Sequence, residues 1–192
     1  MNSSPIRVLG ISGSLREGSY NTKLLLAACE MMPDDMQMDI FNLASLPVYN
    51  DDLRREGYPE PVKEFRQQIA AADALLIATP EYNHSIPGVL KNALDWASRP
   101  PDPPLVGKPV AIMGVSTGNF GTVRAQLHLR QVLFALNSQP VNKPEMLVAR
   151  AAEKFDSDGH LIDETTRTFL RDLLFALKDK TLRVQLLDST LV

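Results

Sequence analysis

Short apolar runs alternate with longer amphipathic stretches along the chain, and this alternation most restricts its fold. Residues 73–79 are almost continuously apolar, which is typical of a strand covered on both faces. Residues 36–43 alternate polar and apolar with period two, as a half-buried or edge strand does. By contrast, residues 60–72 place Val62, Phe65 and Ile69 on one helical face. Strands that alternate with helices predict a parallel sheet with right-handed crossovers and helices on both faces.

The pattern divides the chain into five strand–helix units. The expected strands are 6–12, 36–43, 73–79, 109–116 and an interrupted fifth strand within 139–149. The expected helices are 21–32, 60–72, 87–98, 122–136 and 163–187, with a loop at 44–60 and a stiff proline-rich connector at 99–104. We therefore predict one α/β domain over residues 1–192: a flavodoxin-like three-layer sandwich whose five-stranded parallel sheet has the order 2-1-3-4-5. Its switch point lies between strands one and three, where such sheets bind ligands.

Composition excludes several classes of protein. The 192 residues carry 20 Lys and Arg against 23 Asp and Glu, so the net charge is near -3 and no basic face for nucleic acid is expected. No segment approaches the roughly 20 apolar residues that span a bilayer, and the N-terminus lacks a signal pattern. The single cysteine, Cys29, is compatible with a reducing compartment. We expect a cytoplasmic protein with no membrane partner.

The loop after the first strand is suited to an anion. It follows 6–12 and leads into a helix, so backbone N–H groups and the positive end of the helix dipole meet there. Ser14, Ser19 and Asn21 add side-chain donors, and Arg16 adds a charged planar group. The loop is neither a Walker sequence nor Gly-x-Gly-x-x-Gly, which argues against triphosphate chemistry and a tightly bound dinucleotide. The alternative is that Ser19 only caps the helix and Arg16 is solvated.

Two further loops open at the same edge of the sheet. Thr79-Pro80-Glu81-Tyr82-Asn83 follows the third strand and can offer backbone partners to the edge of a flat ring. Its alternative is a plain turn in which Tyr82 covers the core. The third loop, Ser116-Thr117-Gly118-Asn119-Phe120-Gly121, follows the fourth strand. A phosphate site beside a site for a flat ring, both next to the switch point, suggests bound flavin mononucleotide (FMN).

Other chemistries find little support. The histidines His84, His128 and His160 are too scattered for a local metal motif, although His84 lies beside the expected ring site. A nucleophile elbow is missing, and Cys29 falls in the middle of a helix, so a nucleophilic hydrolase is unsupported. A receiver domain needs acidic residues where this chain has Ser12 and Thr79.

Taken together, the motifs resemble the NADPH-dependent FMN reductases, and most of all their bacterial quinone and chromate reductase branch. The resemblance extends from residue 6 to about residue 150. The matching segments are Gly13-Ser14-Leu15-Arg16-x-x-Ser19-x-Asn21, Thr79-Pro80-Glu81-Tyr82-Asn83, Ser85-x-Pro87-Gly88-x-Leu90-Lys91-Asn92-Ala93-x-Asp95-Trp96, Gly107-Lys108-Pro109, His128-Leu129-Arg130-Gln131 and Asn142-Lys143-Pro144-Glu145.

The resemblance implies bound FMN, with NADPH or NADH as the co-substrate. The FMN phosphate would be held by the first loop and the ring would rest on 80–83, with the 116–118 loop close by. It also implies a homodimer with FMN near the interface, often doubled to a homotetramer, to which Lys91, Asp95 and Trp96 would contribute. The expected cofactor-binding residues are Ser14, Leu15, Arg16, Ser19, Asn21, Pro80, Glu81, Tyr82, Asn83, Ser116, Thr117 and Gly118.

On this basis the expected function is transfer of two electrons from NAD(P)H through FMN to small acceptors. Quinones, chromate, azo dyes and nitro compounds all suit an open flavin face. The cofactor carries the hydride chemistry, so we expect no catalytic acid, base or nucleophile and no metal. Two alternatives stay open: a flavin reductase that supplies reduced FMN to a monooxygenase, and a flavodoxin-type electron carrier without turnover of its own.

Overall fold

The computed structural model describes residues 4–190, and its strands form one parallel sheet. The strands are β1 (Ile6–Ser12), β2 (Met36–Phe41), β3 (Ala74–Ala78), β4 (Pro109–Val115), β5 (Gln139–Pro140) and β6 (Met146–Val148). Their order is β2-β1-β3-β4-β5, and β6 also pairs with β4. The predicted order 2-1-3-4-5 is therefore confirmed, and the interrupted fifth strand consists of the two short pieces β5 and β6.

Strand β1 lies between β2 and β3. Val8 pairs with Met38 of β2 on one side and with Ala74 of β3 on the other. All five residues of β3 and all seven of β4 are buried, as expected for strands covered on both faces. The chain leaves β1 in one direction for β2 and reaches β3 on the opposite side, which creates the switch point.

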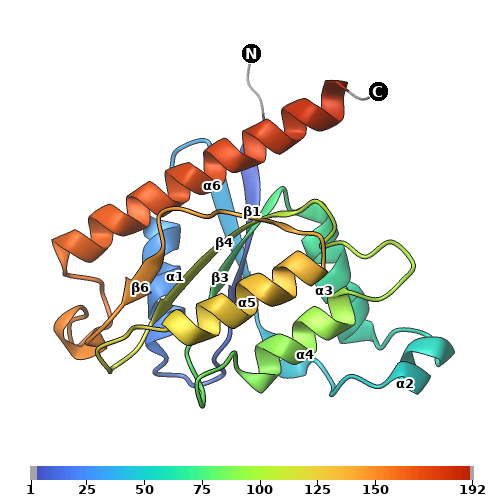
Figure 1. Ribbon diagram of the computed structural model, residues 1–192, viewed down its shortest axis with the longest axis horizontal. Helices are drawn as coiled ribbons and strands as arrows, with labels where there is room; N and C mark the ends of the chain where they lie inside the picture. The colour runs from blue at the N-terminus through green and yellow to red at the C-terminus, as the bar shows by residue number, and fades with distance from the viewer. Residues whose placement is uncertain (1–3, 191–192) are drawn as a thin grey trace.

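Helices cover the sheet in two layers (Figure 1). Helices α1 (Tyr20–Glu30) and α6 (Glu164–Thr190) pack on one face, where Leu24 and Leu174 belong to the same apolar core. Helices α3 (Glu60–Ala71), α4 (Gly88–Ala97) and α5 (Val123–Ala135) pack on the other, around Phe65 and Leu129. The three-layer prediction is confirmed. Within residues 4–190, no helix combines the length and apolarity that crossing a bilayer requires.

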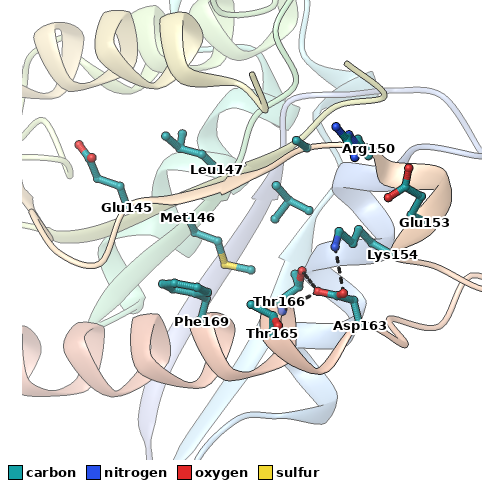
Figure 2. Close-up of a pocket in the computed structure, with 12 residues that line it drawn as sticks. Glu145, Met146, Leu147, Arg150, Glu153, Lys154, Asp163, Thr165, Thr166 and Phe169 are labelled. Carbon is teal, nitrogen blue, oxygen red and sulfur yellow. Dashed lines mark hydrogen bonds and ion pairs between the residues drawn. The ribbon is translucent and has the colours of Figure 1, made fainter. Parts of the chain in front are cut away.

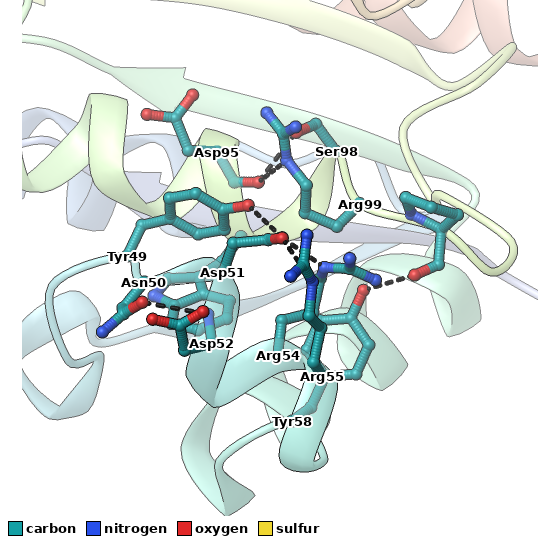
Figure 3. A network of polar contacts seen from close by, with 12 residues as sticks. Tyr49, Asn50, Asp51, Asp52, Arg54, Arg55, Tyr58, Asp95, Ser98 and Arg99 are labelled. Atoms are coloured by element: carbon teal, nitrogen blue, oxygen red, sulfur yellow. Dashed lines mark hydrogen bonds and ion pairs between the residues drawn. The ribbon is translucent and has the colours of Figure 1, made fainter.

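In the segment 44–60, where the sequence predicts a loop, the structure has the end of a short 3-10 helix, η1 (Leu43–Ser45), and a short α-helix. Helix α2 (Asp51–Glu56) lies within 44–60 and is capped by Asn50, whose side chain accepts from the Asp52 backbone N–H. Figure 3 shows the Asp51 carboxylate between the Tyr49 hydroxyl and two arginines of the same helix. These contacts hold the pKa of Asp51 at about 2, chiefly through the hydrogen bond from Arg54. Local capping and ion pairing, rather than apolar periodicity, define this helix.

The proline-rich connector is fixed by one arginine. The Arg66 guanidinium of α3 donates to the backbone carbonyls of Trp96, Ala97, Arg99, Pro101 and Asp102, and it stacks on the Tyr58 ring. The connector therefore has a defined path without regular secondary structure.

Trp96 of α4 lies in the interior of the chain. Its indole is fully buried, donates to the Pro47 carbonyl at 2.8 Å and meets the Tyr49 ring edge-on. The expectation that Trp96 contributes to a subunit contact is wrong, because the chain itself covers this side chain. Lys91 and Asp95 on the same helix are partly exposed and pair with each other at 2.7 Å.

Candidate functional site

The ends of β1, β3 and β4 meet at a cleft of about 160 Å³ beside the switch point. The Gly13 backbone N–H donates to the Ala78 carbonyl at 2.8 Å, which joins the first two loops directly. The cleft is lined by Ser14, Arg16, Ser19, Tyr20, Asn21, Pro80, Glu81, Tyr82, Val115, Ser116 and Thr117. The three loops that the sequence reading placed at one edge of the sheet are indeed together.

The first loop presents donors around the start of α1. The Ser19 side chain caps the helix by accepting from the Thr22 backbone N–H, and the helix has no acidic residue in its first turn. The positive end of the helix dipole is therefore not neutralised from within the helix. Ser14 and Ser19 are buried at the cleft, whereas Arg16 is exposed beside them. A set of hydroxyl and guanidinium donors at a helix N-terminus fits a phosphate group.

Asn21 has a different position from that expected of a simple phosphate donor. Its Nδ2 donates to the Val115 carbonyl at 2.9 Å, and its Oδ1 accepts from the Val115 backbone N–H at 3.0 Å. The side chain is 3% exposed and thus continues the hydrogen bonding of β4 from helix α1. Asn21 fixes the end of β4 against the first loop, and one N–H of its amide remains for a ligand.

The second loop is a tight turn that projects from the site. Tyr82 and Ser85 exchange two backbone hydrogen bonds of 3.0 Å, and the residues between them, Asn83 and His84, have positive φ angles of 49° and 63°. Positive φ at both central residues is what a type I′ hairpin turn requires, and asparagine and histidine adopt this conformation more readily than most residues. The Tyr82 ring is 45% exposed, so the alternative in which it covers the core does not hold. Its hydroxyl lies 3.4 Å from Ser14 Oγ.

A partly buried carboxylate fastens this loop to α5. Glu81 Oε2 accepts from the backbone N–H groups of Arg124 and Ala125, and Oε1 accepts from the Arg124 guanidinium at 2.7 Å. Burial raises the pKa of Glu81, but these hydrogen bonds outweigh that effect and leave the pKa below its usual value. Glu81 is therefore charged at neutral pH and compensated. At the other end of the turn, Ser85 Oγ lies 3.0 Å from His128 Nδ1 of α5.

The third loop is tied to the segment that follows β6. The Ala151 backbone N–H donates to the Ser116 carbonyl, and the Arg150 backbone N–H donates to the Gly118 carbonyl, both at 3.0 Å. Arg150 Nε also donates to Asn119 Oδ1 at 3.2 Å. This loop thus depends on contacts with residues more than 30 positions later in the chain.

Nine of the twelve expected site residues line the cleft, and the other three stand beside it. Leu15 and Asn83 are exposed on the first and second loops, and Gly118 is exposed on the third. The sequence reading missed two lining residues, Tyr20 and Val115. Tyr20 follows Ser19 and Val115 precedes Ser116, so their adjacency to predicted residues is the sequence feature that could have identified them.

One acidic cluster lies outside the cleft, in the turn before α6. Asp156, Asp158 and His160 can bring their ligand atoms within 4.8 Å of one another. Asp156 Oδ1 already accepts three backbone N–H groups of this turn, and its other oxygen meets His160 Nδ1 at 3.1 Å. These contacts account for the arrangement as a turn.

Comparison with known proteins identifies the family. The family model of the NADPH-dependent FMN reductases matches residues 6–153. An NAD(P)H-dependent FMN reductase from Pseudomonas aeruginosa is 52% identical over 92% of this chain and 95% of its own length. A 2-hydroxy-1,4-benzoquinone reductase from Burkholderia is 44% identical over 88% and 92%.

A solved structure gives the same result. The flavoenzyme NAD(P)H:(acceptor) oxidoreductase FerB of Paracoccus denitrificans superimposes with a TM-score of 0.86 at 36% identity, over 93% of this chain and 98% of that one. The predictions of an oxidoreductase, of FMN as its cofactor and of NAD(P)H as its co-substrate are confirmed at the level of the family. The chain belongs to the NADPH-dependent FMN reductase family.

Proposed function

We propose that this protein passes two electrons from NAD(P)H through bound FMN to quinones. The observation that carries the proposal is the cleft itself. It brings hydroxyl and guanidinium donors to a helix N-terminus, next to a protruding turn with an exposed aromatic ring. A mononucleotide needs those two features side by side: an anion site, and a surface for a flat ring.

We infer from the donor set where each end of FMN would bind. Ser14, Arg16 and Ser19 would hold the phosphate, with the remaining N–H of Asn21 close by. The ring would rest along 80–83, with the 116–118 loop beside it. The cleft, at about 160 Å³, is smaller than the roughly 300–1,000 Å³ of sites that enclose a whole ligand, so one face of the ring would stay open to substrates.

When bound, FMN supplies the redox chemistry by accepting hydride from NAD(P)H and delivering two electrons to the acceptor. The protein's own residues bind and orient. Glu81 and Ser85 hold the 82–84 turn against α5, and Asn21 holds the end of β4. These contacts restrict the loops around the cleft, and restricting a binding loop in this way lowers the entropic cost of association.

Quinones are the acceptors that the relatives favour. The Burkholderia relative is named as a benzoquinone reductase, and an Escherichia coli relative 40% identical to this chain is named as a quinone reductase. An open ring face would also admit chromate, azo and nitro compounds. We further infer a homodimer or homotetramer, because a second copy could shield the exposed Tyr82 side of the site. A cytoplasmic location is inferred because NAD(P)H is an intracellular coenzyme.

The test begins with the visible spectrum of the purified protein before and after anaerobic addition of NADPH. A yellow protein that NADPH bleaches, and that a quinone then re-oxidises at the rate of turnover, is the expected result. A colourless protein that consumes NADPH only with added FMN would indicate a flavin reductase instead. A yellow protein that NADPH leaves unbleached would indicate an electron carrier.

Variants then test the phosphate assignment. Arg16→Ala should weaken FMN binding about tenfold or more, because a charge-assisted contact to phosphate is lost. Arg55→Ala is the matched control, since that side chain is 70% exposed on α2. Equal FMN affinity in the two variants would contradict the assignment.

A further inference from the structure

A second cavity, larger than the cleft, lies between β6 and the start of α6. Its volume is about 360 Å³, which is within the range of small-molecule sites. Met146 and Val148 of β6 form buried apolar walls, and Phe169 of α6 stands at the opening with 49% of its surface exposed. Figure 2 shows Met146 and Phe169 close together at one end of this cavity.

The other end of the cavity is polar and balanced in charge. Arg150, Glu153, Lys154 and Asp163 gather there (Figure 2). Lys154 pairs with Asp163 at 2.9 Å, and Asp163 also accepts from the Thr166 side chain and backbone. Those bonds, led by the one from the Thr166 hydroxyl, keep the pKa of Asp163 at about 2, so the pair stays ionised. Because two basic and two acidic side chains lie at this end, the cavity favours neither an anionic nor a cationic ligand.

The shape and charge of the cavity define its ligand. An apolar section beside an exposed phenylalanine suits an aromatic ring, which can stack on or meet Phe169 edge-on. A polar end with both donors and acceptors suits an uncharged hydroxyl or carbonyl group. We propose that this cavity binds an uncharged aromatic compound with a hydroxyl or carbonyl at one end, at a site separate from the flavin cleft.

Arg150 gives this second site a route to the first. It lines the cavity, and its backbone has a φ of 52°, an unfavourable conformation for a residue with a side chain. Its N–H and Nε hold Gly118 and Asn119 of the third loop. A ligand that contacts Arg150 therefore acts on a loop of the flavin cleft, and FMN and the aromatic ligand should alter each other's affinity equally. This consequence rests on the proposed function, whereas the cavity's ligand binding does not.

The probe is N-phenyl-1-naphthylamine, which is uncharged and fluoresces in apolar sites. We expect one bound probe per chain that saturating FMN does not displace. Phe169→Ala should weaken probe binding about tenfold through loss of the aromatic contact. Phe134→Ala is the matched control, because Phe134 is 82% exposed on α5 and lies outside the cavity lining. The 8-sulfonate derivative of the probe, which adds a negative charge to the same rings, should bind more weakly.

The outcomes separate the two parts of the proposal. Equal probe affinity in the two phenylalanine variants, or full displacement by FMN, would overturn the second site. Tighter binding of the sulfonate would overturn the assignment of an uncharged ligand. Probe affinity should change about fivefold between the FMN-bound and FMN-free protein, and Arg150→Gln should abolish that change. No change in the wild-type protein would overturn the connection through Arg150. A protein that binds the probe at Phe169 but never binds FMN would refute the proposed function alone.

Discussion

Asn21 allows a direct test of the contacts that hold the site together, because its side chain hydrogen-bonds to the backbone at the end of β4. Both polar atoms of the amide bond to the Val115 backbone, at 2.9 and 3.0 Å, and the residue is 3% exposed. Asn21→Ala removes both partners and leaves a buried N–H and a buried C=O of β4 unsatisfied. The truncated side chain also leaves a void that the surrounding packing fills only in part.

The expected loss follows from those two groups. An unsatisfied buried backbone group costs about 1–3 kcal/mol, so the variant should lose about 3 kcal/mol in all. For a domain of this size, each kcal/mol lowers the melting temperature by about 2–4 °C, which predicts a decrease of about 6–12 °C.

Thermal unfolding of the FMN-free protein measures this loss without any contribution from the ligand. Asn142→Ala, at an exposed asparagine after β5, is the matched control and should melt within about 1 °C of the wild type. A melting temperature of Asn21→Ala within about 2 °C of the wild type would falsify the assignment of a structural role. FMN binding that weakens without loss of stability would instead make Asn21 a phosphate ligand.

Two further predictions concern strand β4 and the second loop. In Gly114→Ala the added Cβ would overlap Thr122 Oγ1, so we expect the free energy of unfolding in urea to fall by about 3 kcal/mol. Gly88→Ala is the control, because a Cβ at Gly88 meets open space, and it should lose less than about 1 kcal/mol. Equal losses in the two variants would contradict the close packing at Gly114. Glu81 has a lower pKa in the folded protein than its ordinary pKa near 4.5. Its ionised carboxylate therefore contributes fully to stability above pH 4.5, and this contribution is lost as the pH falls through the pKa of the folded state. Urea midpoints measured between pH 3 and 7 should therefore fall less steeply toward acid in Glu81→Gln than in the wild type, and parallel profiles would contradict the ion pair.

The sequence predicts the sheet well because strand order follows from local patterns. Continuous apolar runs identify β3 and β4, and the approximate alternation of polar and apolar residues indicates that β2 is a half-buried or edge strand. The break between β5 and β6 was also predictable, because residues 142–145 interrupt the apolar pattern. Helix α2 was missed, since six residues with no buried member carry no apolar periodicity. Its cap, Asn50, was the available signal.

The site was predicted as a set of loops rather than as a set of contacts. Parallel strands bring their carboxyl ends to one edge, so the positions of Ser14, Tyr82 and Ser116 follow from topology alone. The hydrogen bonds and ion pairs that fix those loops join residues far apart in sequence, such as Glu81 and Arg124. No local sequence pattern predicts such pairs. The error at Trp96 has the same origin, because a large aromatic residue on a helix can face either a partner or the core.

The expectation that no side chain acts as a catalytic acid or base leads to a last prediction. Tyr82 and His84 are the titratable groups on the exposed turn beside the cleft. If either moved a proton in the rate-limiting step, its removal would cost about 10²–10⁴ in rate. If the cofactor carries the chemistry, Tyr82→Phe and His84→Ala should each lower kcat less than about tenfold and act mainly on KM.

Stopped-flow reduction by NADPH and re-oxidation by a quinone separate the two halves of turnover, so each variant can be assigned to one of them. Tyr82→Phe keeps the ring and removes only the hydroxyl that lies 3.4 Å from Ser14 Oγ. His84→Asn is the control for His84→Ala, because asparagine tolerates the left-handed backbone at this position, where φ is 63°. A hundredfold fall in either half-reaction in Tyr82→Phe, or in both His84 variants, would show that the turn supplies an acid or a base. The protein would then do more than bind and orient.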